Sequence, residues 1–164
     1  ATIAFFLIYS FYEPYKTGND SLVYYKDGEM LFNLAKSNPK SFVRLMTGFK
    51  INAEDELNSK QMNYWNRPYE SVVPNDNRTI IRINVLQHFV SFNNYLVHLI
   101  LMSFLSFIGL MAIYKTFLHV CFEHRWKAVL PIFIIPSTLF WSSGNIKEPI
   151  LVLAFGLSLF YYVK

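Results

Sequence analysis

The 164-residue chain lacks the signatures of many common protein classes. It has one cysteine, Cys121, which excludes an intramolecular disulfide framework. No Cys/His spacing is typical of a zinc site, and no stretch matches a P-loop, a dinucleotide fingerprint, a nucleophile elbow or a haem-binding pair. No internal repeat or low-complexity segment is visible, and nothing predicts a nucleic-acid partner. Clues to function must therefore come from polar residues placed between apolar runs.

Charge is missing from one long stretch. Between Tyr95 and Tyr114 only His98 titrates near neutral pH. As a helix this run is about 30 Å long, which matches the hydrocarbon core of a bilayer. Since 53% of the residues are hydrophobic and 18% aromatic, we predict an all-α integral membrane protein, a helical bundle with about four transmembrane helices.

The apolar runs and polar segments predict an order of membrane spans and loops. The chain opens on Ala1, and only about twelve residues precede the first charge. We therefore expect a truncated first span, with a cleaved signal peptide as the alternative. The expected segments are a span at 1–12, an outer loop at 13–88, a span at 89–117, a cytoplasmic loop at 118–127, a span at 128–141, an outer turn at 142–148 and a span at 149–164.

Orientation follows from the short basic loop. The loop at 118–127 contains the basic residues Arg125 and Lys127 and a single acidic residue, Glu123. Short loops with an excess of basic residues stay in the cytoplasm. Segments 13–88 and 142–148 then lie on the far side, which is the periplasm if this is a bacterial inner-membrane protein.

The outer loop is predicted to contain helices, because apolar residues recur among its ten Lys/Arg and nine Asp/Glu. One helix is expected in 20–37, and Asn38 with Pro39 predicts the start of a second. In that second helix the apolar stripe is Phe42, Leu45, Met46 and Phe49. Such a helix lies at the membrane interface or packs on a soluble subdomain.

The rest of the outer loop divides into two parts. Segment 52–74 is the most loop-like, with three consecutive acids, Glu54, Asp55 and Glu56. Helix is expected to resume at Asp76 or Asn77 and to continue unbroken into the long span. Trp65, Trp141, Tyr161 and Tyr162 are expected to act as anchors at the membrane interface.

Asp20 is the first candidate for chemistry. It follows the first apolar segment closely, so it should lie near the membrane surface. A carboxylate there can act as a general base or hold a metal, or it can simply cap a helix.

The polar turn "SSGNIKEP" contains the second candidate pair, Lys147 and Glu148. Asn145 with Glu148 fits a capping box, although the helix could instead begin at Pro149. A helix N-terminus beside a lysine favours phosphate or pyrophosphate, and Glu148 suits a second acid or a metal ligand. A capped turn with a snorkelling lysine is the alternative.

Other polar residues have open roles. Arg78 and Arg82, one turn apart, could clamp a phosphate, bind anionic lipid headgroups or pair with the acidic loop. Asn94 and His98 share a helix face in the long span, where a histidine is either a packing residue or a ligand.

The order of spans and loops resembles the amino-terminal module of GT-C polytopic glycosyltransferases. "GNDSLVYY" (18–25) looks like their Asp-and-Tyr signature, and "PSTLFWSSGNIKEP" (136–149) is similar to a Pro-Ser…Phe-Trp-x-Ser-Gly-x-x-Lys-Asp/Glu stretch in membrane proteins of Bacteroidetes-type bacteria. The first loop departs from the pattern because it lacks an Asp-Asp or Asp-Glu pair, and Asp27 competes with Asp20.

The resemblance implies a function. A GT-C enzyme would use a polyprenyl-phosphate-linked sugar at the outer face, as in polysaccharide biosynthesis. Asp20 and Glu148 would be catalytic and could hold Mg or Mn. Donor and phosphate contacts would come from Lys147, Arg78, Arg82 and Tyr24. The alternative is a non-catalytic subunit of a larger respiratory or secretion complex, with other membrane subunits and lipids as partners.

Overall fold

The computed structural model describes residues 20–66, 76–120 and 125–164. These residues form helices and no strand, so the predicted all-α class is confirmed. They fall into two compact units, an amino-terminal unit (Asn19–His98) and a carboxy-terminal unit that includes Leu99–Lys164. The predicted first span at 1–12 lies outside the described residues.

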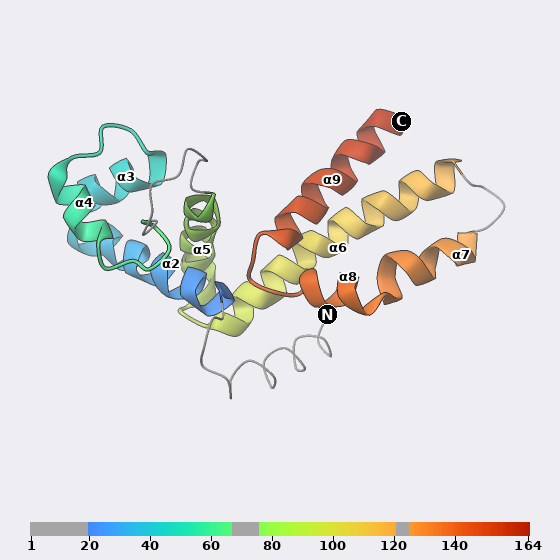
Figure 1. Cartoon of the computed structure of the whole chain (residues 1–164), viewed down its shortest axis with the longest axis horizontal. Helices are drawn as coiled ribbons and strands as arrows, with labels where there is room; N and C mark the ends of the chain where they lie inside the picture. The colour runs from blue at the N-terminus through green and yellow to red at the C-terminus, as the bar shows by residue number, and fades with distance from the viewer. Residues whose placement is uncertain (1–19, 67–75, 121–124) are drawn as a thin grey trace. The chain divides into compact units, whose positions relative to one another are not determined.

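The described residues of the amino-terminal unit form four helices and the first turn of a fifth, which Figure 1 labels. They are α2 (Asp20–Ser37), α3 (Pro39–Thr47), α4 (Ala53–Ser59), α5 (Asn77–Ser91) and the start of α6 (Tyr95–Val120). α2 lies against α5 and α3, and α3 lies against α4. The buried apolar side chains include Leu31, Leu45, Ile80, Ile81 and Val85.

α2 and α5 pack closely at Gly28. A methyl group added to Gly28 would come within 2.7 Å of the Asn84 Cβ. Only glycine therefore fits at this crossing, and it brings the polar side chain of Asn84 into the interior, where Asn84 is completely buried.

The start of α3 follows the sequence prediction. The Asn38 side chain accepts a hydrogen bond from the Ser41 N–H, and Pro39 occupies the first turn. Leu45 is buried against the unit, so α3 packs on a subdomain, which was one of the two alternatives. Phe49 lies beyond the end of the helix and is exposed.

Two predictions about this unit are wrong. Segment 52–74 was expected to be loop-like, but it contains α4, which begins with a capping box between Asn52 and Asp55. The helix from Asn77 was expected to continue into the long span, but it ends at Ser91. Phe92 and Asn93 have positive φ angles of 51° and 59°, and this left-handed pair breaks the helix before Tyr95.

The carboxy-terminal unit contains the rest of α6, then α7 (Arg125–Val129), a π-helical turn η2 (Leu130–Ile134), α8 (Pro136–Trp141) and α9 (Glu148–Val163). Pro131 and Pro136 lie in η2 and at the start of α8, so the expected span at 128–141 is broken into short pieces. α6 is the one described helix long and apolar enough to cross a membrane; α9 is apolar but shorter.

α6 and α9 lie side by side (Figure 1), and Gly109 and Gly156 lie where the two helices contact. A methyl group on Gly109 would lie 2.6 Å from the Leu153 Cα, and one on Gly156 would lie 2.8 Å from the Gly109 carbonyl carbon. Small residues at a crossing allow two helix backbones to approach closely, which is a common way to pack helices in membranes.

Candidate functional site

Asp20 is the first residue of α2 and is exposed. The Tyr64 hydroxyl donates a hydrogen bond of 2.8 Å to its Oδ1 atom. This hydrogen bond, together with partial burial, raises the pKa of Tyr64. Asp20 is therefore an accessible carboxylate whose position is held by a tyrosine.

Asp27, the competing carboxylate on α2, is fully buried. Its two oxygens accept backbone N–H bonds from Asn63 (2.9 Å) and Tyr64 (2.7 Å). Asp27 therefore fixes the backbone of the same tyrosine whose hydroxyl reaches Asp20. The two aspartates differ in role: Asp27 anchors the segment that follows α4, while Asp20 faces solvent.

Tyr24 is 5% exposed, and its hydroxyl donates to the Asn77 Oδ1 atom at 3.0 Å. Its ring packs edge-on against Tyr64, with centroids 5.4 Å apart. These contacts make Tyr24 part of the packing beside Asp20. Its role in binding substrate stays a prediction.

Arg78 and Arg82 lie on α5 and surround Trp65. Their guanidinium carbons are 5.4 and 5.3 Å from the centre of the indole ring. Arg78 Nε donates to the Trp65 carbonyl oxygen (3.0 Å), and Arg82 donates from Nε (3.2 Å) and Nη2 (2.9 Å) to the Leu45 carbonyl oxygen. Burial, followed by the nearby charge of Arg78, lowers the pKa of Arg82. These contacts give both arginines a structural function, and phosphate binding by them stays a prediction.

Trp65 was expected to anchor the unit at the membrane interface, and that prediction is wrong. It is 1% exposed and lies under the two arginines. Trp141, Tyr161 and Tyr162 are exposed.

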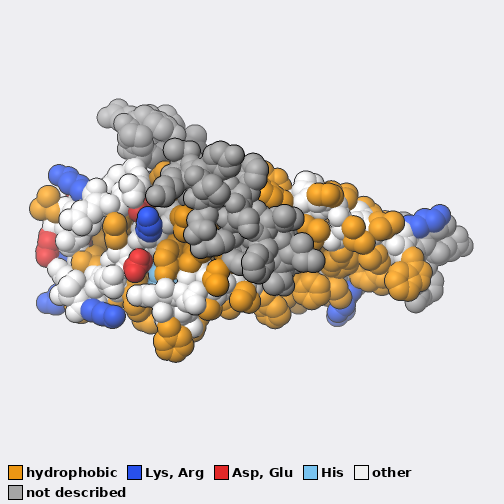
Figure 2. Space-filling view, turned by 90° about the horizontal axis from the view of Figure 1, so that it is seen from below, with side chains coloured by type: hydrophobic (Ala, Val, Ile, Leu, Met, Phe, Trp, Pro, Cys, Tyr) orange, Lys and Arg blue, Asp and Glu red, His pale blue; other side chains and the backbone are white. Residues whose placement is uncertain are grey.

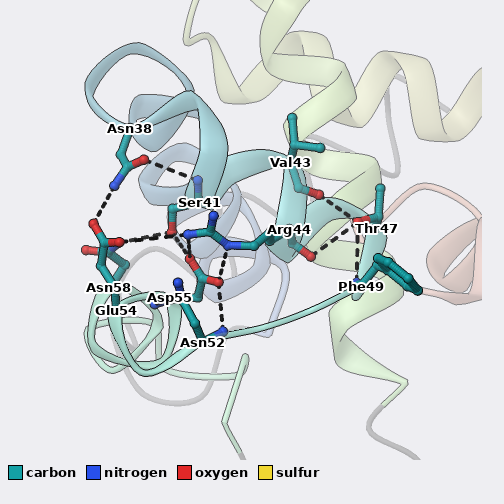
Figure 3. Close-up of polar contacts among 10 residues, drawn as sticks. All are labelled: Asn38, Ser41, Val43, Arg44, Thr47, Phe49, Asn52, Glu54, Asp55 and Asn58. Atoms are coloured by element: carbon teal, nitrogen blue, oxygen red, sulfur yellow. Dashed lines mark hydrogen bonds and ion pairs between the residues drawn. The ribbon is translucent and has the colours of Figure 1, made fainter.

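Asp55 is the centre of a polar cluster that joins α3 to α4 (Figure 3). Arg44 donates to both carboxylate oxygens, at 2.6 and 2.7 Å, and the Ser41 hydroxyl and the Asn52 N–H donate as well. The Arg44 guanidinium holds the pKa of Asp55 well below its usual range. Two of the three acids in the first turn of α4, Glu54 and Asp55, thus pair with Arg44 on α3. The capping-box spacing Asn52-x-x-Asp55 was the sequence signal for this cluster.

His88 and His98 form a buried pair between α5 and the first turn of α6. Their ring centres are 4.5 Å apart. His98 Nδ1 lies 2.9 Å from the Asn84 Oδ1 atom, and Nε2 lies 2.8 Å from the Ser91 Oγ atom. Since Asn84 uses its NH2 group to bond the Ile80 carbonyl, its oxygen faces His98, so Nδ1 carries the proton and Nε2 accepts from Ser91. His98 is therefore a packing residue with satisfied hydrogen bonds, whereas Asn94 is exposed.

Lys147 and Glu148 lie at the start of α9 and are each partly buried. The helix begins at Glu148 with Lys147 at the N-cap position, so the expected cap at Asn145 is wrong; Asn145 is instead fully buried in the turn. Asp20 belongs to the amino-terminal unit and Glu148 to the carboxy-terminal unit. Their convergence around one substrate or metal stays a prediction.

Within the described residues, no group of three or more His, Cys, Asp or Glu side chains is arranged to hold a metal ion. The comparisons with known proteins add no further constraint. No family model, no curated protein and no solved structure matches this chain.

Proposed function

We propose that this chain is the amino-terminal module of a GT-C-like membrane glycosyltransferase. It would transfer sugar from a polyprenyl-phosphate donor at the outer face of a bacterial inner membrane, with 13–88 in the periplasm and about four membrane spans. The observation that carries the proposal is the environment of Asp20. It is an exposed carboxylate at the start of α2, whereas Asp27 and Asp55 are buried and bonded within the unit.

Each proposed role follows from the chemistry of the residue. Asp20 would accept the proton of the acceptor hydroxyl, and Tyr64 would hold its carboxylate in place. Lys147, beside the N-terminus of α9, would bind the donor phosphate. Glu148 would act as the second acid.

A divalent cation such as Mg²⁺ or Mn²⁺ fits the type of donor atom at these two residues. Magnesium is commonly held by one or two carboxylates together with substrate phosphates. Asp20 and Glu148 would be the protein ligands, and the cation would neutralise phosphate charge.

Turnover of a lipid-linked sugar by the full-length protein in membranes tests the proposal. We expect Asp20→Asn and Glu148→Gln each to abolish turnover while the protein keeps its helical content and its yield. Glu56→Gln is the matched control, because Glu56 is an exposed acid of the same unit that has no proposed role. Full turnover by both test variants would reject the glycosyltransferase assignment.

A second candidate is a non-catalytic subunit of a larger membrane complex. It is favoured by the exposed apolar side chains of α6 and α9, including Phe104, Phe107, Leu151 and Phe155, and by Trp126 of α7, which is 85% exposed. Such surfaces fit either lipid or other membrane helices. This reading predicts stoichiometric co-purification with membrane partners from mild detergent and no loss of function in Asp20→Asn.

A further inference from the structure

The end of α5 carries an apolar surface that the amino-terminal unit does not bury. Leu86, Phe89 and Val90 are 60%, 58% and 58% exposed, and they share one helix face at i, i+3 and i+4. Phe92, just beyond the helix, is 94% exposed, the highest value among the large hydrophobic side chains of the described residues. We call these four residues the α5 apolar face. A contiguous exposed patch of this kind marks a contact surface.

The exposure of Phe92 comes from a fixed turn. Its backbone has a φ of 51°, a left-handed conformation that a bulky side chain rarely adopts. The turn is held from both sides: the Tyr25 hydroxyl donates to the Asn93 carbonyl at 2.7 Å, and His88 Nδ1 lies 3.2 Å from the Asn93 Oδ1 atom. A strained residue persists where its surroundings determine it, so the structure presents the Phe92 ring outward in a defined place.

The α5 apolar face is continuous along the chain with α6. Only Asn93 and Asn94 separate Phe92 from Tyr95, where the membrane-length helix begins. Three residue steps span at most about 11 Å, so Phe92 stays close to the level at which α6 would enter a bilayer. Along α6 the exposed residues Leu96, Ile100 and Phe104 follow at intervals of four, so they share one face of that helix.

A basic side chain flanks the α5 apolar face. The Phe32 ring of α2 packs edge-on against Phe89, with centroids 4.9 Å apart, and the Lys36 Nζ atom lies 5.0 Å from the centre of the Phe32 ring. Lys36 is exposed. An ammonium group beside exposed aromatic rings suits the boundary between lipid phosphates and acyl chains.

Hydrophobic side chains also gather on the visible surface of the carboxy-terminal unit, with few charges among them (Figure 2). On α3, by contrast, Leu45 is 1% exposed and packs in the unit, and Phe42 and Met46 are partly buried. Exposed apolar side chains also occur at Val43, Phe49 and Leu57 of this unit, but those of the α5 apolar face lie next to the start of α6 along the chain.

We propose that Leu86, Phe89, Val90 and Phe92 insert into the headgroup–acyl boundary of the lipid bilayer, with Lys36 at the level of the lipid phosphates. The contact would hold the amino-terminal unit against the membrane surface beside the entry point of α6. This proposal rests on α6 crossing the membrane and is independent of any sugar transfer.

Spin labels on the full chain in vesicles of phosphatidylcholine and phosphatidylglycerol test it. In a Cys121→Ser background, single cysteines at Leu86, Phe92, Leu57, Phe49 and Phe104 are labelled. Collision with oxygen, which concentrates in lipid, is compared with collision with a water-soluble nickel complex. Leu57 on α4 is the matched control for Leu86, because it is the same residue type with the same 60% exposure.

We expect the oxygen-to-nickel ratio at Leu86 and Phe92 to exceed that at Leu57 several-fold and to approach that at Phe104. Ratios at Leu86 and Phe92 equal to that at Leu57 would overturn the proposal, as would a lipid-like ratio at Phe49 in place of Phe92.

Low collision with both reagents, or dipolar broadening between labels, would identify a protein partner or a second copy and would equally reject lipid. A water-like ratio at Phe104 would remove the premise that α6 crosses the bilayer. None of these readings depends on a sugar donor, so they are distinct from a failure of the glycosyltransferase assignment.

Discussion

The contacts inside the amino-terminal unit differ in kind from those inside the carboxy-terminal unit. In Asn19–His98, buried carboxylates bind other segments of the unit: Asp27 binds the backbone at Asn63 and Tyr64, 36 and 37 residues away, and Asp55 binds Arg44, 11 residues away. In Leu99–Lys164, α6 and α9 meet through Gly109 and Gly156, and the side-chain hydrogen bonds of Thr116, Ser142 and Ser143 stay within three or four residues.

This difference corresponds to the surroundings that each unit suits. A helix pair packed by backbone proximity leaves its large apolar side chains free to face lipid. A unit tied by carboxylates and guanidiniums depends on specific partners, because a buried charge without one is costly. The following changes should therefore affect the two units through separate mechanisms.

The largest effect is expected at the α6–α9 crossing. Gly109→Ala adds a methyl group where the backbone of Leu153 already lies, so the two helices must separate, at a cost of about 3 kcal/mol. Hydrogen exchange of the full-length protein should show faster opening of α9 with unchanged α2. Ala154→Leu, at an exposed position of α9, is the control. If the α9 amides of Gly109→Ala were protected from exchange as well as those of the unchanged protein, the two helices would pack less closely than described.

A second change tests the buried acids of the amino-terminal unit. Asp27→Asn replaces one of two acceptor oxygens with an NH2 group that faces a backbone N–H, which should cost about 2 kcal/mol. The exposed Asp20→Asn should change stability by less than about 0.5 kcal/mol. Exchange rates at the Asn63 and Tyr64 amides report the difference. Similar rates in both variants would contradict a structural role for Asp27.

A smaller effect is expected at Arg82. Lysine cannot donate two bonds to the Leu45 carbonyl while covering Trp65, so Arg82→Lys should cost about 1 kcal/mol, seen as faster exchange at the end of α3. We expect the KM for a lipid-linked sugar to stay the same. A raised KM with unchanged exchange would instead support phosphate binding by this residue.

The last effect is a loss of stability of the amino-terminal unit in acid. Asp55 has a lowered pKa in the folded unit, so its contribution to stability is present above the ordinary value of 3.8 and is lost as the pH falls below it. When unfolding is followed by signals from the amino-terminal unit, the denaturant concentration at the midpoint should therefore decrease as the pH is lowered below 3.8. Asp55→Asn should be less stable at neutral pH and should show a weaker acid dependence. If Asp55→Asn lost stability in acid as much as the unchanged protein, other carboxylates would be responsible for the acid dependence.

Local sequence patterns predicted several elements correctly. The helix at Asp20–Ser37, the cap at Asn38 with Pro39 and the membrane-length helix α6 were all readable, because capping and periodicity act within a few residues. Local reasoning failed at Phe92 and Asn93. Phe92 is not a residue type that breaks helices, and the turn is stabilised both by nearby His88 and by Tyr25, which is 68 residues away from Asn93 in the chain.

The candidate site divides in the same way. By itself the sequence determined where acids and bases lie relative to apolar runs, and so which residues could act near a membrane. Only the tertiary structure decided that Asp20 is exposed while Asp27 is buried, and that Arg78 and Arg82 hold Trp65 and Leu45. The physical reason is that the burial and hydrogen-bond partners of a charge depend on other segments, 13 residues away for Arg78 and 36 or 37 for Asp27 and Arg82, which composition and spacing do not encode.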